Sequence, residues 1–375
     1  MAFTSDERQL LHDSLQDYFA NSYTFEHYRA LTGTASGDDG FSRRNWSEYA
    51  ELGWLGVALP ESAGGSSGAM TELAIVLAAA GAALALEPFH ATLVLGAAAI
   101  SEAGSPAQRE LLNDVAAGRQ LLALCHYEPN SGYARDYVRT LARKQGDNYV
   151  LTGEKAFTLS AHAADHLVIS ARVENDTGPL ALFLIPAGTA GVETVTAPAL
   201  DGRRGAAVTL SNVEIRATSR LENAGADAGP MLEQLLDRGA IGVCAEAVGA
   251  MAAVTGQTTE YLKSREQFGQ PLSKFQVLQH RLVDMSVAVE EARAVVHAAL
   301  EATDDDQPDA QRMVWKAKVQ TAKASRFVGG QAIQLHGGMG MTDELAIGHY
   351  YKRLAMCETM FGDAQWYLKR LGASI

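Results

Sequence analysis

One short segment of the chain gathers the residue types that bind phosphate groups. It runs from Arg265 to Gln276, between two long helical patterns, and contains an arginine, several glutamines and two phenylalanines. The guanidinium of Arg265 could pair with a pyrophosphate through two parallel N–H donors, while Gln267 and Gln276 could reach other polar atoms. A surface loop rarely exposes aromatic side chains such as Phe268 without a partner. We expect a ligand or subunit contact here, with ordinary loop packing as the alternative.

Three further motifs have simpler interpretations. Gly337-Gly-Met-Gly340 lacks the preceding strand of a dinucleotide fingerprint, so it is either a helix–helix turn or a contact to a phosphate. Gly64-Gly-Ser-Ser-Gly68 matches a nucleophile elbow as a string, but a helical pattern precedes it, which indicates a flexible loop. His162 and His166 have metal-ligand spacing without a completing carboxylate or thiol cluster, so we expect no metal site.

The elements that must position these residues fall into three blocks. Residues 1–120 have helical spacing of apolar residues and begin with the capping-box string Thr4-x-x-Glu7. Residues 121–227 contain short, β-branched, often alternating segments, which predict a small antiparallel β domain. Residues 228–375 return to the helical period, as in a four-helix bundle. The predicted fold class is α+β, with an N-terminal helical domain, a middle β domain and a C-terminal four-helix bundle.

Within these blocks the individual elements can be placed approximately. The predicted strands are Tyr149–Thr152, Leu167–Val173, Leu180–Ile185, Val192–Thr196 and Val208–Ile215. The predicted bundle helices lie near 229–264, 274–302, 308–335 and 343–371.

Composition narrows the class of protein. The 375 residues are 47% hydrophobic and 20% charged, with a net charge of −13, which predicts a folded chain that repels nucleic acid and anionic membrane surfaces. The longest apolar run, Leu73–Leu86, is too short to span a bilayer, and the first residues lack signal-peptide features. The three cysteines are widely separated and predict no disulfide framework. We therefore expect a cytoplasmic protein without nucleic-acid or membrane partners.

Four strings in the right order resemble the acyl-CoA dehydrogenase family over essentially the whole chain. They are Glu51-Leu-Gly-Trp-Leu-Gly-Val-Ala-Leu-Pro60, Leu151-Thr-Gly-Glu-Lys155, Tyr261-Leu-Lys-Ser-Arg-Glu-Gln-Phe-Gly269 and Gln334-Leu-His-Gly-Gly-Met-Gly340. The resemblance implies FAD-dependent α,β-desaturation of an acyl-CoA thioester. A carboxylate takes the α proton and the flavin accepts the β hydride. It also implies a flavin shared between two subunits, with an electron-transferring flavoprotein as the electron acceptor.

The resemblance assigns one half of this cofactor site to residues that are present. The loop residues that match the family are Arg265, Gln267, Phe268, Leu272 and Gln276, and the turn residues that match are Gln334, Gly337 and Gly338. These residues are expected to hold the diphosphate and adenosine of FAD.

The other half of the site, the wall against the isoalloxazine ring, departs from the family pattern. Where members usually have Thr-Glu-Pro-Gly-Ala-Gly-Ser-Asp, this chain has Tyr127-Glu-Pro-Asn-Ser-Gly-Tyr-Ala134. The usual Trp-x-Thr is Phe157-Thr-Leu159. Tyr127 and Tyr133 add volume and replace small hydroxyls, which argues against a standard pocket.

The catalytic base is also absent from its usual places. The resemblance puts the common base position at Phe361 and the alternative position at Gly239, and neither residue can accept a proton. Three nearby carboxylates, Glu246, Glu358 and Asp363, are candidates for a relocated base. In a regular helix, Glu246 and Glu358 would lie on the correct faces, whereas Asp363 would point about 200° away.

Three hypotheses follow from this mixture of intact and altered features. The first is a subunit without the base in a heterotetramer, where a second acyl-CoA dehydrogenase chain supplies the glutamate. The pattern resembles the small subunits of the pimeloyl-CoA and steroid side-chain enzymes. The second is a self-sufficient homodimer or homotetramer with a relocated carboxylate. The third is a flavin-free scaffold or CoA-thioester binder.

Overall fold

The computed structural model describes residues 3–33 and 39–374. The chain folds into two compact units. The sheet unit contains Leu31–Ala69 and Leu86–Gly239, and the bundle unit contains Phe3–Ala30, Met70–Ala85 and Ala240–Ile375. The helices and the β domain of the predicted α+β class are confirmed.

The sheet unit is built on a seven-stranded sheet in the described residues, in the order β1-β4-β2-β3-β7-β6 with β5 paired to β4. The strands are β1 (Leu122–Cys125), β2 (Leu141–Gln145), β3 (Asn148–Leu159), β4 (His166–Val173), β5 (Leu180–Pro186), β6 (Val192–Pro198) and β7 (Arg204–Arg216). All five predicted strands are present within β3 to β7. The short strands β1 and β2 were not predicted, and each of them pairs with β4 in parallel, whereas the other ladders are antiparallel.

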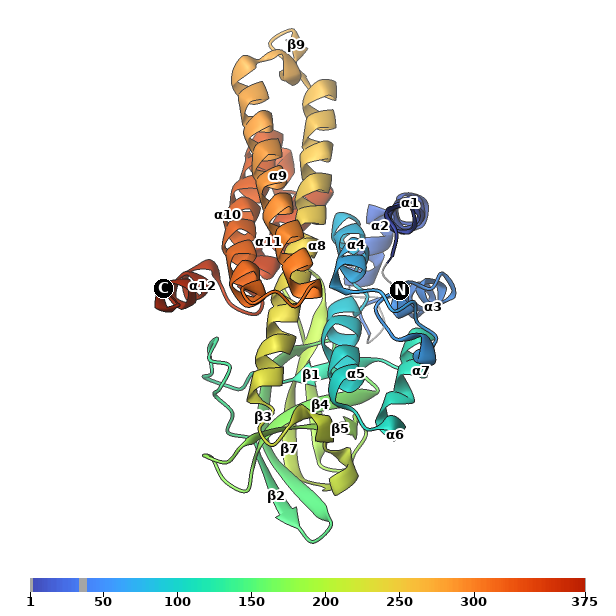
Figure 1. The fold of residues 1–375 in the computed structure, drawn as a ribbon. Helices are drawn as coiled ribbons and strands as arrows, with labels where there is room; N and C mark the ends of the chain where they lie inside the picture. The colour runs from blue at the N-terminus through green and yellow to red at the C-terminus, as the bar shows by residue number, and fades with distance from the viewer. Residues whose placement is uncertain (1–2, 34–38, 375) are drawn as a thin grey trace. The chain divides into compact units, whose positions relative to one another are not determined.

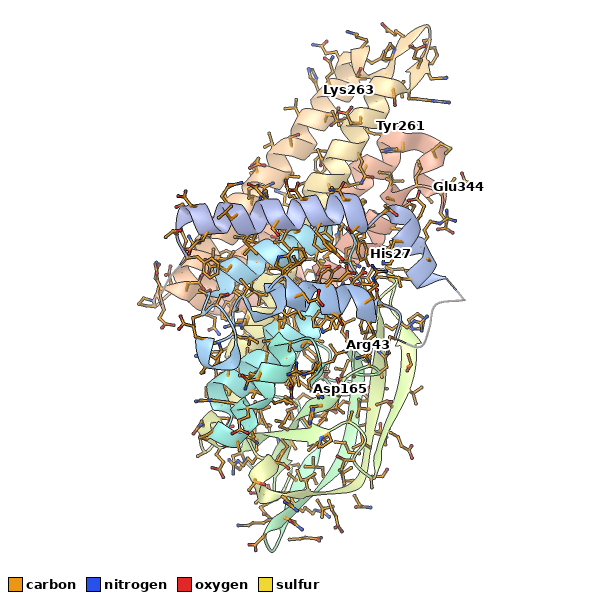
Figure 2. All side chains as sticks on the ribbon, turned by 90° about the vertical axis from the view of Figure 1, so that its right-hand side faces the viewer. His27, Arg43, Asp165, Tyr261, Lys263 and Glu344 are labelled. Atoms are coloured by element: carbon orange, nitrogen blue, oxygen red, sulfur yellow. The ribbon has the colours of Figure 1, made fainter. Side chains whose placement is uncertain are left out.

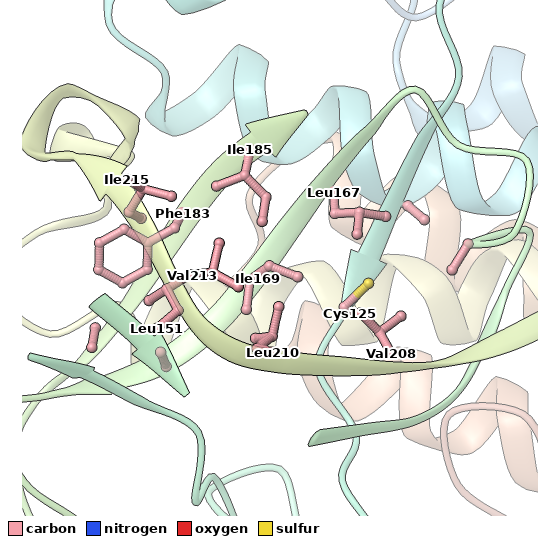
Figure 3. Packing of buried hydrophobic residues seen from close by; sticks show 14 of the residues in the cluster. Cys125, Leu151, Leu167, Ile169, Phe183, Ile185, Val208, Leu210, Val213 and Ile215 are labelled. Atoms are coloured by element: carbon pink, nitrogen blue, oxygen red, sulfur yellow. The ribbon is translucent and has the colours of Figure 1, made fainter. Parts of the chain in front are cut away.

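One face of the sheet forms a continuous apolar core (Figure 3). Leu151, Ile169, Phe183, Val208 and Val213 all belong to this cluster and are fully buried. They come from β3, β4, β5 and β7, so the alternating apolar pattern of these strands places every second side chain on one face.

Short helices accompany the sheet in this unit. They are α3 (Arg43–Glu51), a π-helical segment (His90–Ala97), α5 (Ala98–Ala103), α6 (Pro106–Arg109) and α7 (Leu111–Ala116), with 3₁₀ turns at Trp54–Gly56, Glu61–Ala63, Ala217–Ser219 and Glu222–Ala224. The π-helical segment packs on β1, where the Thr92 hydroxyl donates to the Leu122 carbonyl at 3.3 Å and accepts from its N–H at 3.2 Å.

The bundle unit consists of long helices that lie side by side (Figure 1). They are α8 (Gly229–Ser264, whose first turns belong to the sheet unit), α9 (Gln276–Asp304), α10 (Ala310–His336) and α11 (Ala346–Thr359). α1 (Ser5–Ser22), α2 (Phe25–Thr32), α4 (Met70–Ala82) and α12 (Ala364–Ala373) complete it, with a hairpin of β8 (Glu266–Gln267) and β9 (Gln270–Pro271) and 3₁₀ turns at Leu272–Lys274 and Gly337–Met341. The capping box at Thr4 and Glu7 is present at the start of α1.

The fourth predicted bundle helix is not continuous. α11 ends at Thr359, and α12 starts only at Ala364. Between them Phe361 has φ +61° and Gly362 has φ +124°, values outside the right-handed helical region. A Cβ at Gly362 would lie 2.7 Å from the Trp366 ring, so this glycine is required by the close approach of α12. The assumption of a regular helix through Asp363 was therefore wrong.

The backbones of α4 and α8 cross in direct contact. A Cβ added to Gly81 of α4 would lie 2.1 Å from the Glu246 carbonyl oxygen, and one added to Gly249 of α8 would lie 1.8 Å from the Ala78 carbonyl oxygen. The start of α4 is capped by Asp304, which accepts from the Met70 and Thr71 N–H groups at 3.0 Å each. Glycines at both crossing points let the two helices approach this closely.

α8 is long and apolar enough to cross a membrane by length and composition alone. In the described structure, 83% of its most apolar window is buried. The hydropathy of this helix is thus explained by packing inside the protein.

The crossing of α4 and α8 predicts opposite effects for two glycines of the same helix. Gly249→Ala should lower the free energy of unfolding by about 1–3 kcal/mol or more, because its Cβ would collide with a backbone oxygen. Gly256→Ala is the matched control: its Cβ would meet no atom within 4 Å, so helix propensity should raise the stability by about 0.5–1 kcal/mol. Denaturant unfolding measures both, and equal effects would contradict the close crossing.

Candidate active site

The loop from Arg265 to Gln276, which was predicted to bind a phosphate group, forms a small exposed hairpin at the end of α8. Strands β8 and β9 pair, and the Leu272 N–H donates to the Arg265 carbonyl at 2.8 Å. Phe268 at the hairpin tip has φ +55° and is 90% exposed, with its ring 6.0 Å from that of Phe275 in an edge-to-face contact. In the described part of the chain, the Arg265 guanidinium makes no ion pair or hydrogen bond. The loop therefore presents an aromatic ring and an available cation to solvent.

The glycine-rich turn ends α10. Gln334 is exposed in the last turn of this helix, and Gly337 has φ +60°, where its N–H donates to the Gln334 carbonyl. A Cβ added to Gly338 would meet no atom within 4 Å. The turn thus leaves open space over exposed backbone, which suits the approach of a ligand.

The loop and the turn lie at the same end of the bundle. Tyr261, in the last turn of α8, stacks on His336 at the end of α10 with ring centroids 4.2 Å apart, and its hydroxyl donates to the His336 carbonyl at 3.4 Å. Figure 2 shows Tyr261 and Lys263 near this end of α8. Because Arg265 and Gly337 directly follow these two helix ends, the structure brings the two predicted parts of the cofactor site close together.

This donor set fits the diphosphate of a dinucleotide. Arg265 offers several N–H donors in a fixed planar arrangement, which match phosphate oxygens. Gln267, Gln276 and Gln334 are exposed and add neutral donors and acceptors, while Leu272 is half-buried. FAD could therefore be held here by groups that have few competing partners.

The wall segment of the sheet unit is fixed by a buried ion pair. Lys155 Nζ donates to Glu128 Oε1 at 2.7 Å, and both side chains are almost completely buried. Glu128 also accepts from the Arg139 N–H at 2.6 Å and from the Thr140 hydroxyl at 2.6 Å. Burial alone would raise the pKa of Glu128, but the charge of Lys155 and these hydrogen bonds outweigh it and hold the pKa below its usual value. Glu128 is thus an anchor of the wall.

A second buried cluster ties the same segment to the first turns of α8. Arg135 Nη1 donates to Glu233 Oε2 at 2.7 Å and to Asp237 Oδ1 at 2.8 Å. The Arg135 side chain is 2% exposed. The hydroxyl of Tyr127 lies beside this guanidinium, and burial raises the pKa of Tyr127 to about 12. Tyr127 therefore stays protonated at neutral pH and cannot serve as a base.

The other altered wall residues are bulky and lie near the surface. Tyr133 is half-buried and Phe157 is 42% exposed. A Cβ added to Gly205 on β7 would lie 2.6 Å from the Phe157 ring, so this ring covers the strand backbone. Thr158 is buried and donates to the Ala156 carbonyl at 3.2 Å, whereas Leu159 is half-buried.

Neither of the two residues that the resemblance places at a base position carries a carboxylate. Phe361 is half-buried in the break between α11 and α12, where its carbonyl accepts from the Tyr367 hydroxyl at 2.9 Å. Gly239 lies inside α8. Lys318, fully buried in α10, donates to the carbonyls of Cys357 and Glu358 at the end of α11. These contacts fix the backbone just before Phe361.

The first candidate for a relocated base, Glu246, is held in a buried ion pair. Arg353 Nη1 donates to Glu246 Oε1 at 2.8 Å, and the two side chains are 1% and 4% exposed. Arg353 also donates to the Ala85 carbonyl at 3.0 Å. Taking Glu246 as a base would require breaking a buried pair, which is costly because the arginine would remain buried and unpaired.

The other two candidates also have structural partners. Glu358 forms an ion pair with Arg326. Asp363 is the N-cap of α12 and accepts from the Trp366 N–H at 2.8 Å. Each carboxylate is thus already engaged in a helix-terminal or interhelical contact.

Sequence reasoning missed the residues that fix this site. Arg135, Asp237, Lys318 and Arg353 are charged residues that are almost completely buried. Glu246 has a sequence signal, a charge within the apolar stretch Cys244-Ala-Glu-Ala-Val248, but each of these four residues has another charged residue one or two positions away and lacks that signal. That signal indicates that a partner exists but does not say which residue it is.

The two histidines with metal-ligand spacing have separate partners. His162 Nε2 lies 2.8 Å from the Asp39 carbonyl oxygen, and His166 Nδ1 lies 3.0 Å from Gln120 Oε1. Among the described residues, no group of three or more histidine, cysteine or acidic side chains is placed to hold a metal ion.

Models of the three acyl-CoA dehydrogenase domains match nearly the whole chain. The N-terminal domain matches residues 5–119, the middle domain matches residues 123–216 and the C-terminal domain matches residues 229–375. The chain therefore belongs to the acyl-CoA dehydrogenase family.

Individual relatives agree with this assignment. The probable acyl-CoA dehydrogenase YngJ of Bacillus subtilis is 28% identical over 369 residues, which cover 96% of this chain and 95% of that protein. Among solved structures, a variant of the Tcur3481-Tcur3483 steroid acyl-CoA dehydrogenase is 30% identical with a TM-score of 0.88, covering 98% of this chain and 97% of that one. The ChsE4-ChsE5 complex from Mycobacterium tuberculosis is 25% identical with a TM-score of 0.89, covering 99% and 98%.

His126, at the start of the wall, predicts an acid-sensitive stability. Burial, together with the nearby charges of Lys155 and Arg135, lowers the pKa of His126 to about 3, and its Nδ1 lies 3.0 Å from the Ser170 hydroxyl. In the unfolded chain a histidine has a pKa of about 6.5, so below that pH the unfolded state binds a proton that the folded state does not. Stability should therefore fall as the pH drops from about 6.5 toward 3.

The variant His126→Leu tests this contribution. Between pH 6 and pH 4 the free energy of unfolding of the wild type should fall more steeply than that of the variant, by about 1.4 kcal/mol per pH unit. His280→Leu, at an exposed position on α9, is the control and should leave the slope unchanged. Parallel curves for the wild type and His126→Leu would refute the contribution.

Proposed function

We propose that this chain is the subunit without the catalytic base in a heterotetrameric, FAD-dependent acyl-CoA dehydrogenase. A second acyl-CoA dehydrogenase chain would supply the glutamate and the flavin wall. The present chain would hold the diphosphate end of the cofactor. An electron-transferring flavoprotein would accept the electrons, and we place the complex in the cytoplasm, consistent with three buried free cysteines.

This proposal rests on one observation: each candidate carboxylate already forms an ion pair or caps a helix. The resemblance places Phe361 and Gly239 at the two base positions. Among the candidate carboxylates, Glu246 pairs with the buried Arg353, Glu358 pairs with the exposed Arg326 and Asp363 caps α12. A base must be free to take a proton from the carbon next to the thioester, and its pKa must be raised toward the working pH. Glu246 is paired with a buried cation, so it is not free to take that proton.

The residues that remain available support a role in cofactor binding. FAD, when bound, supplies the hydride acceptor for the desaturation. Arg265 would neutralise its diphosphate, and the exposed turn at Gly337 and Gly338 would help to orient it. Phe268, at the tip of an exposed hairpin, would cover an apolar part of the cofactor or of the neighbouring chain.

Two-chain assemblies among the similar proteins point the same way. One similar structure is named as the ChsE4-ChsE5 complex and another as a steroid acyl-CoA dehydrogenase with two components in its name. By analogy, we extend this arrangement to the present chain, with a fatty or steroid acyl-CoA as the substrate class.

Purification with and without a partner tests the proposal. Expressed alone, the chain should be colourless and inactive, because it provides neither the flavin wall nor the base. Co-expressed with an acyl-CoA dehydrogenase chain that has the glutamate, it should co-purify as a yellow complex that is bleached by acyl-CoA. A yellow, active protein from this chain alone would instead indicate a self-sufficient enzyme, and absence of colour in every combination would indicate a flavin-free scaffold.

Arg265→Ala tests the diphosphate contact in that complex. A charge-assisted hydrogen bond contributes about 1.5–3 kcal/mol, so the dissociation constant for FAD should rise about ten-fold or more. Lys263→Ala is the control, because Lys263 lies two residues earlier, is exposed and pairs with Glu260 at 2.7 Å. Unchanged flavin content in Arg265→Ala would remove the proposed role.

A further inference from the structure

The bundle unit contains a cavity of about 820 Å³ that is separate from the candidate active site. Its walls come from α1, α4, α8, α9 and α11, and none of the residues assigned to the cofactor or to the base lines it. The volume lies within the range of about 300–1,000 Å³ that is usual for small-molecule sites. Neither the desaturation nor the flavin contact uses this space.

The cavity is open because small residues line it where larger ones would fill a solid core. Ala74, Ala78 and Ala82 on α4 and Ala245 and Ala252 on α8 all line it. Several of these alanines are only half-buried, since solvent reaches them through the cavity. Protein interiors are normally close-packed, and an apolar space gives water few hydrogen-bond partners. The interior is therefore suited to an apolar ligand.

Polar side chains gather at the rim of the same cavity. His12 and Gln16 come from α1, and Arg293 and His297 come from α9. The Arg293 Nε pairs with Glu290 at 3.2 Å, but in the described part of the chain both of its Nη groups have no partner. Arg293 and Glu290 are 51% and 67% exposed, so this surface pair is weak and leaves donors for a ligand.

Other charged groups around the rim do not cancel this cation. His12 contacts Asp13 at 3.3 Å and His297 contacts Glu301 at 3.5 Å, and these carboxylates do not line the cavity. Gln257, an exposed residue of α8, donates to the hydroxyl of the buried Tyr350 at 3.2 Å, and that hydroxyl donates to the Ala82 carbonyl. The Tyr350 hydroxyl thus has its partners within the protein, whereas the Nη groups of Arg293 are available to a ligand.

We propose that this cavity binds a fatty carboxylate, with its hydrocarbon tail against the alanine-lined walls that α4 and α8 provide and its carboxylate at Arg293. The apolar walls select the tail, and a guanidinium with two unpaired Nη groups matches the geometry of a carboxylate. The protein as a whole has a net charge of −13, so an anion is attracted here only by this local cation.

Binding of decanoate to the purified chain, alone or in its complex, tests the site by calorimetry below the micelle concentration. Ala252→Phe fills the cavity and should raise the dissociation constant at least ten-fold, and Ala79→Leu is a smaller filling change on α4. Ala294→Phe, at an exposed position on α9, is the matched control and should bind as the wild type does. Unchanged binding in both filled variants would overturn the site.

The head group is tested with a neutral ligand of the same length. Arg293→Gln should weaken decanoate at least five-fold and leave 1-decanol unchanged, whereas Arg312→Gln, exposed on α10, should affect neither. Equal affinity for the two ligands, or no effect of Arg293→Gln, would overturn the carboxylate assignment. These measurements need neither flavin nor CoA, so their failure is distinct from a failure of the proposed desaturase role.

Discussion

A buried charge has to be neutralised by groups of the protein itself, because the interior cannot solvate it as water does. In the sheet unit this requirement joins Lys155 to Glu128 and Arg135 to Asp237. In the bundle unit it joins Arg353 to Glu246. Each pair connects segments that are far apart in the sequence, so the pairs fix the wall segment and the helix packing at the same time.

The same requirement limits the chemistry that the chain can perform. A carboxylate that compensates a buried arginine or caps a helix is needed where it is, and using it as a base would leave its partner unsatisfied. The Arg265 guanidinium, by contrast, has no ion pair or hydrogen bond in the described part of the chain, and this residue directly follows the end of α8. This difference between the engaged acids and the available Arg265 guanidinium is the physical basis for our proposal that this chain contributes one half of a shared site.

Much of the fold could be predicted because its elements have strong local signals. The helical period located α8, α9 and α10 to within a few residues, and alternating β-branched residues located β3 to β7. The break at Phe361 could not be predicted, because a left-handed phenylalanine has no sequence signature and depends on the packing of α12. β1 and β2 were missed because one is a very short apolar run and the other is rich in charged residues.

The candidate site could be predicted only where its residues lie close together in the sequence. Motif residues that lie close together in sequence, such as Arg265 and Phe268, also share one hairpin. Glu246 and Arg353 are 107 residues apart, so their pairing depends on how α8 and α11 pack. Without that pairing, Glu246 was an open candidate for the base.

A structure of the co-purified complex with flavin and a substrate analogue would show which chain provides each end of the cofactor site. We expect the cofactor diphosphate to contact Arg265 of this chain and the carboxylate at the thioester α-carbon to belong to the partner chain. A homomeric assembly in which an acidic side chain of this sequence faces the α-carbon, beside a complete isoalloxazine pocket, would contradict it.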